Sequence, residues 1–499
     1  MHALAASLPL AIVIAAMAVL RWRAVSAGLL GFAVALLLAL AVFGLGDDAG
    51  LAPAVAVGGA LAEALFTTAT ILWIVFPALC IYEMQARAGA FDTIRGGLSR
   101  LSADPRMLVL LVAWFFGLFM EGVAGFGTPV ALAAPILVGL GFSPVRAVTL
   151  ALIGHAAGVS FGAVGTPVLP QMAATGLSGI ELARPAALLH ALVGWILVAV
   201  LFAMASDGWP RAREWAWAAL AAFLFFAPAL ALAWFVGPEL PTLGGAIIGG
   251  TLFALALRRA GSAADASGPS AREMARAALP YLVLLALILI TRLVPPLRDM
   301  LRDIAVAWSL SGSFSGRMEV LYHPGTMLFL GFALGGLLQG RSLAELVSAM
   351  RGAAARLLPV AAALAAMLAL SRVMVHAGMI GELAEAAAAS GPAWPLLAPF
   401  VGVLGTFVTG SATASNILFS EFQQVTAATL SLPVALLQGA QNFGAAVGNI
   451  ISPHNIIAGA ATVALAAGRE GEVLRATALV CLLYATAGGL ATLLLAMLG

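Results

Sequence analysis

Long apolar segments dominate this sequence and constrain its fold more than any other feature. Most of them are about as long as the roughly 17–25-residue helix that crosses a bilayer. Hydrophobic residues make up 63% of the 499 residues and charged residues only 9%, against about 25% charged in a soluble domain. The sequence therefore predicts an all-α polytopic membrane protein. The apolar segments lie at residues 3–20, 25–45, 57–84, 184–205, 214–235, 241–257, 278–294, 325–339, 357–377 and 474–498.

Arginines in the loops indicate how these segments are oriented. Arginine in short loops marks the cytoplasmic side, so Arg21 and Arg23 place the first loop inside and the N-terminus outside. Because this charge follows the 3–20 segment instead of preceding it, the segment is expected to be a retained helix and not a signal peptide. The polar, arginine-bearing stretch 258–276 is predicted to be a cytoplasmic linker. Residues 295–324 are expected outside from the order of the segments, yet they carry arginine, so this stretch stays unassigned.

Two longer apolar regions, 107–180 and 394–467, are interrupted by polar and small residues and match each other. In both regions the same residue types recur in the same order at nearly equal spacing, which indicates an internal repeat. The matching anchors are Gly89, Gly122, Gly158, Gly162 and Pro167 in the first half, and Gly378, Gly410, Gly444, Gly448 and Pro453 in the second.

The flanking charge predicts that these two units are antiparallel across the membrane. The loop before the first unit carries arginine at positions 87, 95, 100 and 106, whereas its counterpart, residues 379–395, has no arginine and carries two glutamates. The two loops therefore belong on opposite sides. Inverted repeats with broken helices are typical of secondary transporters.

Each unit is predicted to contain a re-entrant hairpin followed by a helix that breaks near its middle. Arginines flank both ends of the first hairpin, so both ends belong on the cytoplasmic side. In a helix, residues 107–121 rise by about 1.5 Å each and span roughly 22 Å, which puts the hairpin tip inside the membrane. The expected total is twelve crossings, with both termini outside. The hairpins are predicted at residues 107–141 and 394–431, their tips at 122–129 and 409–416, and the breaks at 162–167 and 448–455.

The tips and breaks supply polar groups for a substrate site. Free backbone N–H groups and the positive ends of helices bind anions, and none of the four elements contains arginine. An anion would thus be held by amides, hydroxyls and helix dipoles. The alternative for each hydroxyl is a hydrogen bond back to its own helix. The predicted substrate-binding residues are Gly127, Thr128, Thr166, Ser411, Thr413, Ser415, Asn416, Ser452 and Asn455.

Three ionisable residues, Glu121, His155 and His454, are the predicted proton-coupling residues. An ionisable group deep in apolar sequence is functional by default, as a proton relay or an ion ligand. The alternatives are a structural ion pair for Glu121 and a satisfied core position for each histidine. The sequence shows no nucleotide-binding loop, metal-ligand cluster or catalytic constellation, so it predicts no enzyme activity, cofactor, bound metal or nucleic-acid partner.

Five stretches at the tips and breaks carry a family resemblance: EGVAGFGTP at 121–129, LVGLGF at 137–142, FGAVGTPVL at 161–169, GSATASNILF at 410–419 and ISPHNIIAGAATV at 451–463. They resemble the lactate permease family of bacterial 2-hydroxy-monocarboxylate transporters, within the wider ion-transporter superfamily. The resemblance implies uptake of L-lactate, D-lactate or glycolate with protons across the cell inner membrane. The sequence differs from the family pattern at Ala412, Asn449 and His454, where the family commonly has aspartate, lysine and glutamine.

The resemblance also implies an elevator-type transporter, in which a transport domain bearing two hairpins slides against a scaffold, and a homodimer. The expected organisation is N-terminal scaffold helices (1–56), the first inverted repeat with a cytoplasmic-side hairpin (57–183), transmembrane helices (184–257), the cytoplasmic linker (258–276), scaffold helices with an amphipathic segment (277–356), the second inverted repeat with an outer-side hairpin (357–470) and a C-terminal helix (471–499).

Other interpretations of the function are open at this point. A sodium-coupled transporter of a di- or tricarboxylate, or of another organic anion, fits the same scaffold, since unwound helices offer carbonyl oxygens to Na⁺. A membrane-embedded enzyme would need a convergent catalytic set, and Glu121 with His155 is a sparse one. A channel would not need two inverted hairpins.

Overall fold

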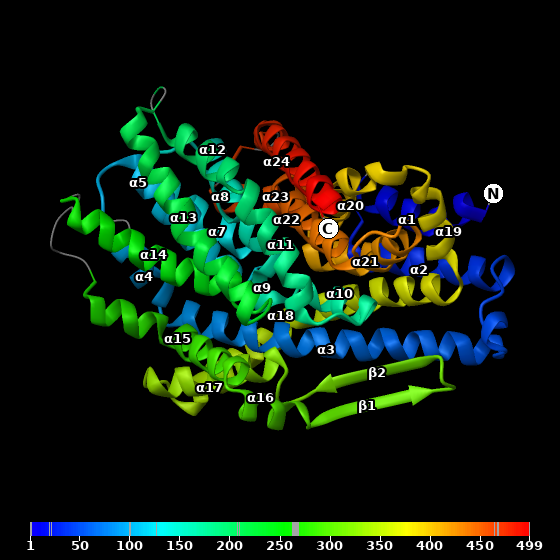
Figure 1. Cartoon of the computed structure of the whole chain (residues 1–499). Coiled ribbons are helices and arrows are strands. Elements are labelled where there is room, and N and C mark those ends of the chain that lie inside the picture. The colour runs from blue at the N-terminus through cyan, green and yellow to red at the C-terminus, as the bar shows by residue number, and fades with distance from the viewer. Residues whose placement is uncertain are drawn as a thin grey trace.

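The computed structural model describes residues 2–18, 20, 22–98, 101–125, 127–206, 208, 210–261, 269–463, 465–466 and 469–498. These residues are almost entirely helical, with one two-stranded sheet (Figure 1). Part of the expected linker, residues 262–268, lies outside the described residues.

The prediction of a polytopic helical membrane protein is confirmed. Ten helices among the described residues are long and apolar enough to cross a membrane, or eleven if the bent pair α11–α12 is one span. Two of the ten, Pro105–Val123 and Gly391–Thr409, are first arms of the expected hairpins. The number of twelve crossings, and the side on which each loop lies, stay predictions.

The same order of elements occurs twice along the chain. A long helix is followed by a short helix, then by two helices that pack against each other as a hairpin, and then by an interrupted helix. The two long helices, α3 and α18, pack side by side. The first set is α3 (Pro53–Arg87), α4 (Ala90–Leu98), the hairpin α5 (Pro105–Val109), η2 (Leu110–Phe116), α6 (Gly117–Val123) and α7 (Thr128–Gly139), and the interrupted helix α8 (Pro144–His155), η3 (Ala156–Phe161), α9 (Gly162–Gly165) and α10 (Val168–Thr175). The second set is α18 (Leu343–His376), α19 (Met379–Ala388), η4 (Gly391–Ala393), the hairpin α20 (Trp394–Thr409) and α21 (Ala412–Thr429), and the interrupted helix α22 (Val434–Gly448), η5 (Asn449–Ile451) and α23 (Pro453–Thr462).

The remaining helices surround these two sets. Helix α14 packs on α6, α11 and α24 pack on α22, and α2 packs on α18. Their bounds are α1 (His2–Ala18), α2 (Ala24–Ala41), η1 (Asp47–Ala49), α11 (Gly179–Val193), α12 (Trp195–Ala205), α13 (Ala212–Phe235), α14 (Pro241–Arg259), α15 (Ala271–Leu293), α16 (Pro295–Arg302), α17 (Pro324–Leu338) and α24 (Glu470–Leu498).

Residues 295–324, which the sequence left unassigned, form α16 and an antiparallel hairpin of β1 (Ala305–Leu310) and β2 (Phe314–Glu319). The hairpin lies along the first half of α3 (Figure 1). Phe314 is buried there against Gly59, and the backbone N–H of Ser315 donates to Oε1 of Glu63 at 3.0 Å. A two-stranded hairpin is marginal alone, so its contact with α3 explains why it forms here.

Candidate functional site

The first tip and the first break are held by backbone that favours glycine. Gly125 and Gly127 at the tip adopt positive φ of 56° and 80°. In the break, Ala163 and Val164 also have positive φ, 43° and 55°, a conformation that costs a non-glycine residue about 1–3 kcal/mol. Such strain concentrates at functional sites, and here it separates α8 and η3 from α10.

The second tip and break are simpler. Gly410 ends α20 with φ of 73°, and Ser411 then caps α21 by accepting a hydrogen bond from the N–H of Ala414 at 3.3 Å. The first N–H groups of a helix have no partner inside it. The N–H groups of Ala412 and Thr413, at the N-terminus of α21, are therefore without a hydrogen bond inside that helix. The second break is a short turn, η5, followed by extended backbone at Ser452.

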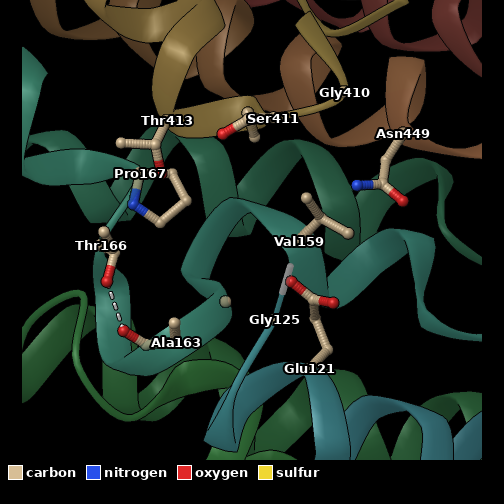
Figure 2. A pocket seen from close by; sticks show the side chains of 12 residues that line it. Glu121, Gly125, Val159, Ala163, Thr166, Pro167, Gly410, Ser411, Thr413 and Asn449 are labelled. Carbon is tan, nitrogen blue, oxygen red and sulfur yellow. Dashed lines mark hydrogen bonds between the residues drawn. The ribbon is translucent and has the colours of Figure 1, made fainter. Parts of the chain in front are cut away.

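All four elements meet around one small cavity. Its volume is about 30 Å³, room for two or three water molecules at roughly 10–15 Å³ each. It is lined from the first tip and break by Glu121, Gly125, Val159, Gly162, Ala163, Thr166 and Pro167, and from the second by Gly410, Ser411, Ala412, Thr413 and Asn449 (Figure 2).

Glu121 is the ionisable residue in the lining of this cavity. It lies on the last turn of α6 and is 4% exposed, and its carboxylate points into the cavity with one oxygen on the side of Gly125 (Figure 2). No hydrogen bond or ion pair joins its carboxylate to the rest of the described chain. Room for the carboxylate comes from glycines, because a Cβ on Gly162 would overlap Oε1 and one on Gly125 would lie 3.3 Å from it.

His155 lies behind the cavity and reaches it through Asn449. Nδ1 is 2.7 Å from the carbonyl oxygen of Ala151, one turn earlier on α8, and Nε2 is 3.1 Å from Oδ1 of Asn449. His155 is 1% exposed and Asn449 is 7% exposed. The contact links the first broken helix to the second.

Of the predicted substrate-binding residues, Thr166, Ser411 and Thr413 line the cavity. The hydroxyl of Thr166 donates to the carbonyl of Ala163 at 2.6 Å. Such a local hydrogen bond is the alternative to substrate binding for this hydroxyl. Thr413 is buried and its hydroxyl makes no hydrogen bond within the described residues, so it is free to bind a ligand.

Ser415 and Asn416 lie one turn deeper on α21 and do not line the cavity. The hydroxyl of Ser415 donates to the carbonyl of Gly402 at 2.9 Å. The amide of Asn416 donates to the carbonyl of Pro167 at 2.8 Å and to Oδ1 of Asn442 at 3.1 Å. Both residues are fully buried, so they join the second hairpin to its surroundings.

Gly127, Thr128, Ser452 and Asn455 gather at a second place, where α7 packs on α23. A Cβ on Gly127 would lie 3.5 Å from Oδ1 of Asn455. That oxygen and the hydroxyl of Ser452 are buried without a hydrogen-bond partner among the described residues. The hydroxyl of Thr128 donates to the carbonyl of Gly125 at 2.7 Å.

His454 is exposed and does not line the cavity. Its side chain lies beside Gly410, where an added Cβ would be 2.9 Å from the Cβ of His454. The third predicted proton-coupling residue therefore flanks the second tip, and is separate from Glu121 and His155.

The prediction of site residues missed Asn449, Gly125 and Gly162. Asn449 could have been found as the polar residue that directly follows the helix at the second break. The two glycines could have been found from their spacing around the first tip and break, but only the structure shows that both face the Glu121 carboxylate.

The fold and the cavity define a class of protein: a multi-pass helical membrane protein in which two helical hairpins and two interrupted helices enclose a central polar site. One solved structure of similar fold is that of the MtrF protein of Neisseria gonorrhoeae, described as illuminating a class of antimetabolite efflux pumps. It matches with a TM-score of 0.52 and 16% sequence identity over 95% of each chain.

Sequence comparison gives the particular family. The model of the L-lactate permease family matches residues 2–499, so the chain belongs to this family. The glycolate permease GlcA of Escherichia coli is 30% identical, over 99% of this chain and 95% of its own. The L-lactate permease of Streptococcus iniae is 32% identical, over 86% of this chain and 92% of its own. The resemblance inferred from the tips and breaks is confirmed.

Proposed function

We propose that this protein takes up lactate or glycolate together with protons across the cytoplasmic membrane. The names of its relatives, glycolate permease and L-lactate permease, support this class of substrate, and support a transporter instead of an enzyme. Both substrates are small 2-hydroxy-carboxylates, which combine one negative charge with a hydroxyl group.

Coupling to protons rests on one observation, the unpaired Glu121 carboxylate in the cavity. An anion in the same cavity would face a second negative charge, and two such charges about 4 Å apart repel by about 4 kcal/mol at an effective dielectric constant near 20. A proton on Glu121 removes this repulsion and supplies a hydrogen-bond donor. Anion and proton would therefore bind together.

The anion itself would be held by the second tip. Ser411, Ala412 and Thr413 line the cavity at the N-terminus of α21, the positive end of its dipole. Their N–H groups and hydroxyls would be the donors. Because no arginine of the described part of the chain lines the cavity, the carboxylate would bind to dipoles and hydroxyls.

Substrate entry would require the tips to separate. Lactate and glycolate have five or six heavy atoms, more than a cavity of about 30 Å³ accommodates. This requirement supports movement of the tips. The proposal includes an elevator-type movement of the hairpins and interrupted helices against the remaining helices, in a homodimer. It also gives His155 and His454 a part in proton coupling.

Uptake of labelled lactate and glycolate by the purified protein in proteoliposomes tests the proposal. An inward proton gradient should drive accumulation, and removal of sodium should not change it. Glu121→Gln, which imitates the protonated acid, should abolish gradient-driven accumulation while counterflow exchange of labelled anion continues. Gradient-driven accumulation by Glu121→Gln would overturn the coupling role, and strict dependence on sodium would favour the sodium-coupled alternative.

A further inference from the structure

The hydrogen bond between His155 and Asn449 can take two arrangements, which differ in the Asn449 atom that faces the cavity. The carbonyl oxygen of Ala151 can only accept a hydrogen bond, so Nδ1 of His155 carries a proton in either charge state. Nε2 is then a donor in the imidazolium and an acceptor in the neutral ring. Asn449 must therefore present its amide oxygen to the imidazolium and its amide nitrogen to the neutral ring.

The contact in the structure is the one that an imidazolium would make. Oδ1 of Asn449 lies 3.1 Å from Nε2, and the amide nitrogen is turned toward the side of the cavity where Val159 and Ser411 lie (Figure 2). A neutral His155 would need the amide nitrogen as its donor, so the Asn449 amide would turn by half a rotation and present its oxygen to the cavity.

The backbone of Asn449 is anchored, which confines this change to the end of its side chain. Its carbonyl oxygen accepts a hydrogen bond from Nδ2 of Asn455 at 3.2 Å, and its side chain is 7% exposed, between the cavity and His155. Rotation of the terminal amide exchanges two groups of nearly equal size, so no repacking is needed.

We infer that Asn449 contacts the transported anion, and that His155 is a positioning residue whose proton turns the Asn449 amide so that its N–H₂ group faces that anion. An amide N–H₂ binds a carboxylate, whereas an amide oxygen repels it. The inference rests on the proposed function and deepens it: it adds a residue to the anion site and gives His155 a role that differs from that of Glu121.

Few other titratable groups can compete for this role. Of the elements packed against α8, its flanking helices η2, α7, α12, η3 and η5 carry none. The others carry Glu121 on α6, His454 on α23, and Glu470, Glu472, Arg475, Cys481 and Tyr484 on α24. Tyr484 bonds to His190 at 2.7 Å, and Glu472 pairs with Arg469. His155 is therefore the titratable side chain that bonds to Asn449.

The test is the KM for labelled lactate in proteoliposomes, measured at several values from about pH 5 to about pH 8. In the wild type, KM should rise with pH, because a neutral His155 turns the amide oxygen to the anion. In Asn449→Ala, KM at acidic pH should rise about tenfold, the effect of losing one hydrogen bond to a charged group, and its pH dependence should become shallower. His155→Gln should flatten the slope to the same degree, and the double variant should show no further flattening.

His190→Gln is the matched control. His190 is also a buried histidine, but it bonds to Ser160 and Tyr484 and does not line the Glu121 cavity. This variant should keep the wild-type slope, and its melting temperature measures the cost of removing a buried histidine. A wild-type slope in Asn449→Ala, or additive flattening in the double variant, would overturn the inference alone. Failure of the wild type to take up either anion would overturn the proposed function as well.

Discussion

Asn416 on the second hairpin donates a hydrogen bond of 2.8 Å to the carbonyl of Pro167 in the first break. These residues are 249 positions apart in the chain and lie in the second and the first of the two sets of helices that share one order of elements. The bond leads into a buried set of amides, because Asn416 also bonds to Asn442 and Gln441. Since buried polar groups are costly when unpaired, this set holds the two halves of the site in one arrangement.

Asn416→Ala should weaken that arrangement. It leaves the Pro167 carbonyl and Oδ1 of Asn442 without their donor, which costs about 1–3 kcal/mol. We expect a lower melting temperature in detergent and reduced uptake. Thr429→Ala is the control, because Thr429 lies exposed on the same helix and bonds only to the carbonyl of Val425. Equal melting temperatures for the two variants would show that the Asn416 bonds contribute little.

Gly162→Ala should disable transport while the protein stays folded. Gly162 has ordinary backbone angles, φ −62° and ψ 155°, so alanine causes no backbone strain there. Its methyl group would instead overlap Oε1 of Glu121 and displace the carboxylate. Uptake should fall at least tenfold, as measured in proteoliposomes.

Gly139→Ala provides the comparison for that variant. Gly139 ends α7 of the same hairpin, is exposed, and has no atom within 4 Å of an added Cβ. Its uptake should match the wild type. Normal uptake by Gly162→Ala would mean that the position of Glu121 is not critical.

The buried ion pair between Arg292 and Glu239 should be sensitive to loss of either partner. Nη2 lies 2.8 Å from Oε1, and both side chains are less than 10% exposed. Removing one partner leaves a buried charge, at a cost of about 3–5 kcal/mol. Glu239→Gln and Arg292→Met should each lower the melting temperature strongly, and the double variant should recover part of the loss. Strict additivity of the two changes would show that the pair does not act as a unit.

Much of the fold follows from local sequence. Apolar length predicted the helices, and the recurring order of glycines and prolines predicted both breaks. A lone proline does not end a helix, because Pro77 and Pro228 lie inside α3 and α13. The predicted segment 357–377 is longer in the structure, where α18 begins at Leu343. A capping box of Ser342 and Glu345 starts that helix, and the helix extends beyond its apolar part.

The site was harder to predict because it is made by long-range contacts. Glu121 was identified by its charge in apolar sequence, but the pairing of His155 with Asn449 joins residues 294 positions apart. Ser415 and Asn416 share the composition of the second tip, yet helical periodicity turns them away from the cavity. The β-hairpin was missed for a similar reason, since its strands depend on α3 for burial.

The attachment of that β-hairpin to α3 gives a last prediction. Phe314 is 2% exposed and packs against Gly59, where a Cβ would overlap its ring. Gly59→Ala should therefore push β2 from α3 and weaken the bond from Ser315 to Glu63. The adjacent Gly58→Ala is the control, because Gly58 is exposed with no atom within 4 Å of an added Cβ. Trypsin can report the difference by cleavage after Arg317, whose side chain is 63% exposed on β2. Cleavage there should be faster in Gly59→Ala than in Gly58→Ala or the wild type. Equal rates in all three proteins would show that Phe314 does not hold the hairpin on α3.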